Sequence, residues 1–148
     1  KKDKNNTTAL INASLCYKML DMTDKSVEYA NKVLAKENLS ADIYYTASKI
    51  DEIKNIQYLK KAVSLDPMMT DAWLDLADIA IKNNRLELAR TYLKPVKYVN
   101  SKDHRYYYLA GLIQKQQGNK EAAQSNFKKS LEINPFFVEA SKELSSQL

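Results

Sequence analysis

The side chains that most often carry out catalysis are few in this chain and lie far apart along it. The sequence has one histidine, His104, and one cysteine, Cys16, and no nucleophile stands at helical spacing from the histidine. The acidic neighbours Asp51 and Glu52 lie at an expected helix start, where carboxylates stabilise the helix macrodipole. The chain also lacks a glycine-rich phosphate loop. We therefore expect a protein that is not an enzyme, and catalysis would require a further domain.

Metal and cofactor sites are not expected either. A single cysteine excludes an internal disulfide, and one cysteine with one histidine excludes a zinc cluster built from these two residue types. Cys16 falls on an expected helix between Ala13 and Tyr17. We interpret it as a small, buried, apolar side chain.

The charge of the chain does not favour nucleic acid as a partner. The net charge of +5 comes from 23 basic and 18 acidic residues, and residues 1–4 supply +2 of it. Three of the basic residues are arginines, namely Arg85, Arg90 and Arg105. Scattered lysines usually form a solvated helix face, whereas recognition of bases and phosphates favours clustered arginines. No apolar run reaches membrane-spanning length, so membrane insertion is not expected.

Three consecutive tyrosines, Tyr106 to Tyr108, are candidates for a binding surface. Tyr107 is equivalent to Trp73 and Tyr44 in the repeat described below, so we expect it to pack between helices. Tyr106 and Tyr108 are the informative pair, because tyrosine supplies a large contact area with few rotatable bonds. We expect Tyr108 to face a partner.

A repeated helical pattern positions these side chains. In residues 71–100, apolar residues recur at helical spacing on both sides of a polar tetrad at residues 82–85, which predicts two helices joined by a short turn. These apolar positions are Trp73, Leu76, Ala77 and Ala80, then Leu86, Ala89, Leu93 and Val96. The pattern returns 34 residues later at Tyr107, Ala110, Gly111 and Gln114, then at Ala123, Phe127 and Ser130, and Gly118 lies 34 residues after Asn84 of the tetrad. A fixed period of this size predicts a stacked array of helices.

The order of large, apolar and small residues, followed by a turn residue and a final proline, resembles the tetratricopeptide repeat. The best copy is YLAGLIQKQQGNKEAAQSNFKKSLEINP, which ends at Pro135, and Pro67 lies two periods earlier. The positions where paired helices approach closely hold small residues: Ser14, Ser48, Ala77 and Gly111 on the first helices, and Ser26, Asn55, Ala89 and Ala123 on the second. The resemblance implies an all-α solenoid of antiparallel helix pairs, with about nine helices wound into a right-handed superhelix.

Four repeats are predicted, at approximately 7–40, 41–69, 70–103 and 104–137, with a terminal helix over 137–148. Residues 8–148 would then form one repeat domain after a disordered, charged start at 1–7. The second repeat is five residues short, because Tyr44 and Trp73 are 29 residues apart instead of 34. We assign this deletion to its inner turn near residues 50–52, so its helices should be short or tightly joined.

Proline, asparagine and serine predict several helix ends. Pro67 disfavours a helical Asp66, and Pro95 should kink the sixth helix. Asn84 can take the left-handed conformation that Gly118 takes one repeat later. Expected helices cover about 8–20, 24–37, a segment after Ser40, 52–65, 70–83, a segment carrying Pro95, 104–117, 120–133, and a ninth from about 136 or 137.

The resemblance also implies a concave groove lined by the first helix of each repeat. Exposed positions on this groove are expected to bind a partner and are Ile11, Leu15, Tyr45, Lys49, Leu74, Asp78, Ile81, Arg105, Tyr108, Leu112 and Lys115. Their apolar character favours an apolar segment of a partner protein. The alternative is that the terminal helix, or further parts of the parent protein, cover them. The family's carboxylate clamp for acidic chaperone tails is expected to be absent, since its positions hold Ile11, Leu15, Tyr45, Asp71 and Leu74.

The predicted function is a non-catalytic scaffold that binds a protein or peptide partner in this groove. A bacterial envelope, secretion or pilus assembly system is one setting that the resemblance suggests. The alternatives are a structural module that associates with itself through the groove or terminal helix, or a fragment of a larger multidomain protein. The sequence starts on charged residues without methionine, which we interpret as a cut from a longer chain. Oligomeric state and compartment, whether cytoplasmic or associated with the envelope or periplasm, stay open.

Overall fold

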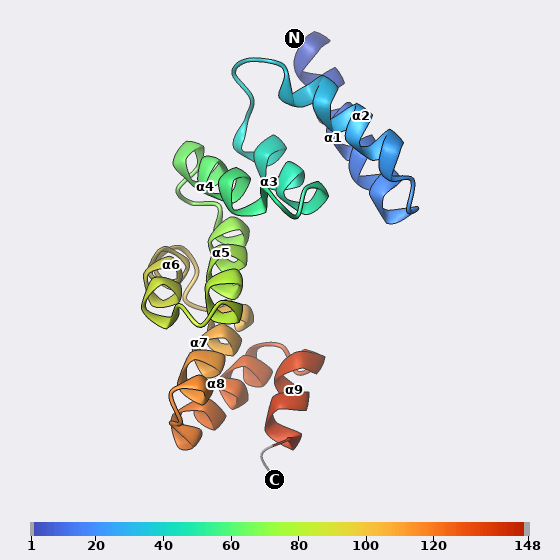
Figure 1. The fold of residues 1–148 in the computed structure, drawn as a ribbon. Helices are drawn as coiled ribbons and strands as arrows, with labels where there is room; N and C mark the ends of the chain where they lie inside the picture. The colour runs from blue at the N-terminus through green and yellow to red at the C-terminus, as the bar shows by residue number, and fades with distance from the viewer. Residues whose placement is uncertain (1, 147–148) are drawn as a thin grey trace. The chain divides into compact units, whose positions relative to one another are not determined.

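The structure is a computed structural model that describes residues 2–146. Over these residues the chain forms helices and no strand (Figure 1). The helices are α1 (Lys2–Met19), α2 (Thr23–Leu34), α3 (Ala41–Ile50), α4 (Asn55–Leu65), α5 (Thr70–Lys82), α6 (Leu86–Val99), α7 (His104–Gln116), α8 (Lys120–Ile133) and α9 (Val138–Ser145). The prediction of an all-α repeat of helix pairs is confirmed. In the described part of the chain no helix is both long and apolar enough to span a membrane.

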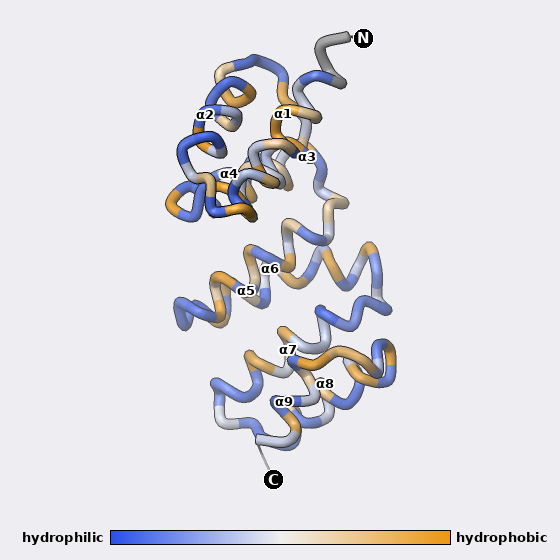
Figure 2. Tube along the Cα trace, turned by 90° about the vertical axis from the view of Figure 1, so that its right-hand side faces the viewer, coloured by the Kyte–Doolittle hydropathy of each residue, from blue (hydrophilic) through white to orange (hydrophobic). Residues whose placement is uncertain are grey.

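The chain divides into two compact units, Lys1–Ala72 and Trp73–Leu148, and each is described by itself. Hydrophobic and hydrophilic residues alternate along the individual helices, as the trace coloured by hydropathy shows (Figure 2). Such mixed helices bury one stripe and leave the other face to solvent. The buried stripes form the core of each unit.

The first unit is built from two helix pairs. Helix α1 packs on α2, α3 packs on α4, and α1 also packs on α3. Its core contains Ile11, Ala30, Val33, Ile43 and Ala47. Where α1 and α2 cross, the hydroxyl of Ser14 donates to the carbonyl oxygen of Ser26 at 2.6 Å, and the hydroxyl of Ser26 donates to the carbonyl oxygen of Ser14 at 2.9 Å. Both buried hydroxyls are therefore satisfied.

The second unit contains the pair α7 and α8, with α6 against α7 and α9 against α8. A cluster of buried residues joins α5, α6 and α7, and it includes Leu74, Leu93 and Ile113. At the crossing of α7 and α8, a Cβ added to Gly111 would lie 2.5 Å from Cε1 of Phe127. No side chain fits there without a shift of the ring, so Gly111 is required by close packing.

Several expected helix ends agree with the structure. Helix α4 ends at Leu65, immediately before Asp66 and Pro67. Asn84 has a positive φ of 55° and Gly118 one of 81°, so both take the left-handed conformation after their helices. Helix α6 continues through Pro95 to Val99, and the kink expected at Pro95 stays a prediction. Helices α3 and α4 have 10 and 11 residues, which agrees with the predicted shortening of the second repeat.

Other expectations need correction. Helix α1 begins at Lys2 instead of Thr8, and the helix covers most of the segment that was expected to be disordered. Helix α4 begins at Asn55, three residues later than expected, because the carboxylate of Asp51 accepts hydrogen bonds from the backbone amides of Ile53 and Lys54 and holds a turn. Cys16 is exposed rather than buried, since two helical residues place it almost opposite the buried Ser14.

Candidate partner-binding site

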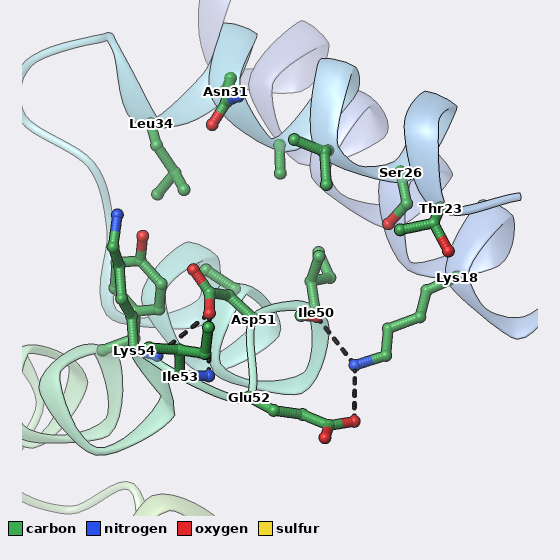
Figure 3. A pocket seen from close by; sticks show the side chains of 14 residues that line it. Lys18, Thr23, Ser26, Asn31, Leu34, Ile50, Asp51, Glu52, Ile53 and Lys54 are labelled. Atoms are coloured by element: carbon green, nitrogen blue, oxygen red, sulfur yellow. Dashed lines mark hydrogen bonds and ion pairs between the residues drawn. The ribbon is translucent and has the colours of Figure 1, made fainter.

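A cavity of about 410 Å³ opens in the first unit between α2 and the connection from α3 to α4 (Figure 3). We call it the α2–α3 cavity. It is lined by Lys18, Thr23, Ser26, Val27, Ala30, Asn31, Leu34, Ala47, Ile50, Asp51, Glu52, Ile53, Lys54 and Tyr58. All of these residues belong to the first unit, so the cavity is a feature of that unit alone.

The cavity lies beside the end of a short helix. Helix α3 has 10 residues, whereas α5 and α7 each have 13. Three residues fewer shorten a helix by about 4.5 Å. Ile50, the last residue of α3, and Val27, in the first turns of α2, both line the cavity. The deletion that the sequence places near residues 50–52 lies at the wall of the cavity.

A lysine from the first repeat closes one end of the cavity. The ammonium of Lys18 donates to the carbonyl oxygen of Ile50 at 2.8 Å and lies 3.2 Å from Oε1 of Glu52 (Figure 3). A cation at this point satisfies a terminal carbonyl of α3 and interacts favourably with the negative end of the helix. The Glu52 side chain is largely exposed, so the ion pair itself contributes little stability.

The floor of the cavity is apolar and its mouth carries exposed apolar side chains. Ala30 and Ala47 are buried in the core of the unit, while Val27 is 48% exposed and Ile53 is 95% exposed. Burial, followed by the charges of Asp51 and Tyr44, raises the pKa of the Tyr58 phenol, so this hydroxyl stays protonated at neutral pH. The arrangement is suited to holding an apolar side chain.

Three of the predicted groove residues are buried, so the prediction that they are exposed was wrong. Ile11 is 1% exposed, Leu74 4% and Ile81 2%. Ile11 packs with Ile43 and Ala47 of α3, and the other two belong to the cluster that α5 shares with α6 and α7. The reason is geometric. The groove-facing positions of one first helix also face the first helix of the next repeat, and long aliphatic side chains are buried there.

The terminal helix covers three further predicted residues in the second unit. The rings of Tyr108 and Phe137 meet edge to face at 5.1 Å, and Leu112 packs in the same cluster as Ala140 of α9. The ammonium of Lys115 lies 2.6 Å from Oε2 of Glu143. For these residues the structure follows the alternative of intramolecular cover. Burial, aided by nearby carboxylates, also raises the pKa of Tyr108.

The remaining predicted residues are engaged within their own units. The ammonium of Lys49 lies 4.7 Å from the ring centre of Tyr45, while Leu15 is half-buried. Asp78 pairs with Lys82 on its own helix at 2.6 Å.

Arg105 binds the carboxylate of Asp103, the N-cap residue of α7. Burial alone would raise the pKa of Asp103, but hydrogen bonds from the side chain and backbone of Arg105 outweigh it and hold the pKa below its ordinary value. A partner-binding role for this and the other groove residues stays a prediction.

Sequence reasoning missed the residues of the α2–α3 cavity. The signal is the short spacing between Tyr44 and Trp73, which predicts short or tightly joined helices but does not by itself predict a cavity. The spacing did not reveal that the missing helical turn leaves an opening lined by Val27 and Ile50.

Comparisons with known proteins agree with the repeat pattern. Two family models, each described as a tetratricopeptide repeat, match residues 56–113 and 104–137. No curated protein gives a significant match. Among solved structures, PilF of Pseudomonas aeruginosa superposes with a TM-score of 0.83 at 19% identity, over 99% of this chain and 69% of that one. These matches show the fold.

Two further solved structures have similar scores. YrrB, described as a tetratricopeptide repeat protein with an unusual peptide-binding site, gives a TM-score of 0.73 at 20% identity, over 96% of this chain and 75% of that one. A MamA structure gives a TM-score of 0.73 at 24% identity, over 91% of this chain and 82% of that one. At these identities the likeness concerns the helical repeat and not the ligand.

Proposed function

This chain belongs to the tetratricopeptide repeat family, whose members bind protein partners and are generally non-catalytic scaffolds, and on that premise we propose that it binds an apolar segment of a partner protein at the α2–α3 cavity. The observation that carries the proposal is an apolar cavity of about 410 Å³ with a half-exposed Val27 and a largely exposed Ile53 at its mouth. Exposed apolar patches of this kind tend to be interaction sites.

The size and lining of the cavity fit one anchoring side chain. Clefts of roughly 300–1,000 Å³ accommodate small organic ligands, so the space is sufficient for a leucine, methionine or phenylalanine with its flanking backbone. Thr23 and Asn31 line the same cavity and offer polar groups to that backbone. A few large side chains in desolvated pockets usually dominate the affinity of such contacts.

A peptide-display selection against the full chain tests this proposal. Selected peptides should share a large apolar residue, and Val27→Asp should weaken their binding roughly tenfold or more, because a carboxylate at the mouth opposes burial of the anchor. Leu65→Asp is the matched control, since Leu65 is also 48% exposed and also lies in the first unit. It should leave binding unchanged.

Peptides that bind both variants as well as the original chain would contradict the cavity as the binding site. The self-associating alternative is separable, because light scattering over a dilution series would then report a concentration-dependent mass. The setting in a bacterial envelope, secretion or pilus assembly system stays a prediction.

A further inference from the structure

A second cavity, of about 350 Å³, lies in the second unit between α6 and α7, and basic side chains dominate its rim. Helix α6 contributes Arg90, Lys94 and Lys97. Residues at spacings of four and three share one face of a helix, and these three cover about 10 Å of its length. We call them the α6 basic stripe.

The other lining groups are neutral. Leu93 and Ile113 are buried and form an apolar floor, while Tyr106 and Gln114 of α7 add a phenol and an amide. No carboxylate lines the cavity. Gln114 already accepts a hydrogen bond from Asn119 through its oxygen, which leaves its amide N–H groups to donate. The polar groups that face the opening are therefore mainly cations and donors.

The surrounding segment is strongly positive. Residues 86–117 contain six basic and two acidic residues, a net charge of +4 within a chain of net charge +5. The two acidic residues, Glu87 and Asp103, pair with Arg90 and Arg105 respectively. Among the described residues neither Lys94 nor Lys97 has an ion-pair partner, and like charges at these spacings repel one another. A bound anion would relieve that repulsion.

We propose that the α6–α7 cavity binds an acidic segment of a partner protein, whose carboxylates pair with the α6 basic stripe while an apolar side chain rests on the floor. The site differs from the carboxylate clamp of the family, because that clamp uses the first helices of repeats and α6 is a second helix. It lies in the second unit and does not depend on the α2–α3 cavity.

The geometry favours a protein segment over a nucleic acid. Three cations over about 10 Å match a few carboxylates, whereas proteins that bind DNA strongly neutralise roughly 6–10 phosphates. Two of the three cations are lysines, and bidentate recognition of phosphate favours arginine. An apolar floor at Leu93 and Ile113 also suits a peptide side chain better than a sugar–phosphate backbone. The experiment therefore also measures binding of an oligonucleotide, as the competing type of ligand.

The experiment measures fluorescence anisotropy of a labelled peptide that mixes glutamate and leucine, titrated with the full chain at low and high salt. Binding should weaken with salt, and a version with glutamine in place of glutamate should bind roughly tenfold more weakly or worse. The double variant Lys94→Glu with Lys97→Glu should reduce binding of the glutamate peptide by a similar factor. Circular dichroism checks that the variant keeps its helices.

The matched control is Lys60→Glu with Lys61→Glu on α4, which changes two exposed lysines and the net charge by the same amount. It should leave binding nearly unchanged. Equal weakening by both double variants, equal binding of the glutamine peptide, or tighter binding of a single-stranded oligonucleotide would overturn the proposal. If the reversed charges impair folding, Lys94→Gln with Lys97→Gln supplies the same comparison with a milder change. Val27→Asp should not affect this peptide, which separates the two proposed sites.

Discussion

The helix crossings of the two units solve the same packing problem with different side chains. Between α1 and α2, Ser14 and Ser26 meet and each hydroxyl donates to the other's backbone carbonyl. Between α7 and α8 the equivalent residues are Gly111 and Ala123, and the ring of Phe127 lies over the glycine. The crossing therefore requires small side chains, and these can be polar or apolar provided that each buried polar group has a hydrogen-bond partner.

The units also differ in whether the surface beside the first helix of a pair is open or covered. In the first unit α3 is short, and an apolar cavity opens beside its end at Ile50. In the second unit α7 has 13 residues, and its Tyr108 and Leu112 belong to the same hydrophobic cluster as Ala140 of α9. Helix length and terminal cover thus decide which surfaces of a repeat remain accessible to a partner.

The largest expected effect concerns the apolar crossing. Gly111→Ala should destabilise the protein by about 1–3 kcal/mol, because its Cβ would overlap the ring of Phe127. Urea unfolding followed by circular dichroism measures the loss. Combining the change with Phe127→Leu should cost less than the sum of the two single changes, since the smaller side chain makes room. Full additivity would mean that the ring is not the cause.

The polar crossing should show a smaller effect with a different signature. Ser14→Ala should cost about 1 kcal/mol, because it removes the donor to the Ser26 carbonyl and leaves a buried hydroxyl less well satisfied. The double change Ser14→Ala with Ser26→Ala should cost less than the two single changes together. A double-mutant cycle in urea measures the coupling. A coupling of zero would show that the two hydroxyls act independently.

The smallest expected effect comes from comparing the N-cap residues of α7 and α3. Asp103 caps α7 by accepting from the backbone amide of Arg105 at 2.9 Å, whereas Ser40 before α3 makes no such side-chain bond. Since the folded pKa of Asp103 is lowered, its contribution is present above its ordinary pKa of about 3.9 and is lost as pH falls through the lower folded value. Asp103→Asn should therefore flatten the acid side of the stability curve.

Urea midpoints between neutral and acidic pH measure this effect. Ser40→Ala is the control and should leave the shape of the curve unchanged, because Ser40 carries no titratable group. An unchanged acid slope in Asp103→Asn would contradict the assignment of that slope to this carboxylate.

Much of the fold could be predicted because local rules decide it. Pro67 ends a helix by steric exclusion, Asn84 and Gly118 adopt a backbone that few residues tolerate, and Gly111 leaves space for a ring. These constraints act within one or two helices. They can therefore be predicted from residue type and spacing alone. The period of 34 residues then assigns the same constraint to the equivalent position of each repeat.

The candidate site could not be predicted in the same way. Helical periodicity tells which face a residue occupies, but it does not tell whether a neighbouring repeat or solvent lies against that face. Ile11, Leu74 and Ile81 were expected to be exposed for this reason and are buried. The cavity beside Ile50 depends on where α3 ends relative to α2. The basic stripe follows from spacing on α6, but the cavity that it borders is formed together with α7, whose place the spacing does not give.

The bond from Lys18 to the carbonyl of Ile50 links repeats that a sequence alignment would treat as separate modules. A side chain of α1 thus hydrogen-bonds the last carbonyl of α3, so the C-terminal end of α3 depends on the preceding helix pair. A gene duplication or a designed graft that moved residues 41–69 alone would leave that end to fray. A designed graft should therefore move the first two helix pairs together.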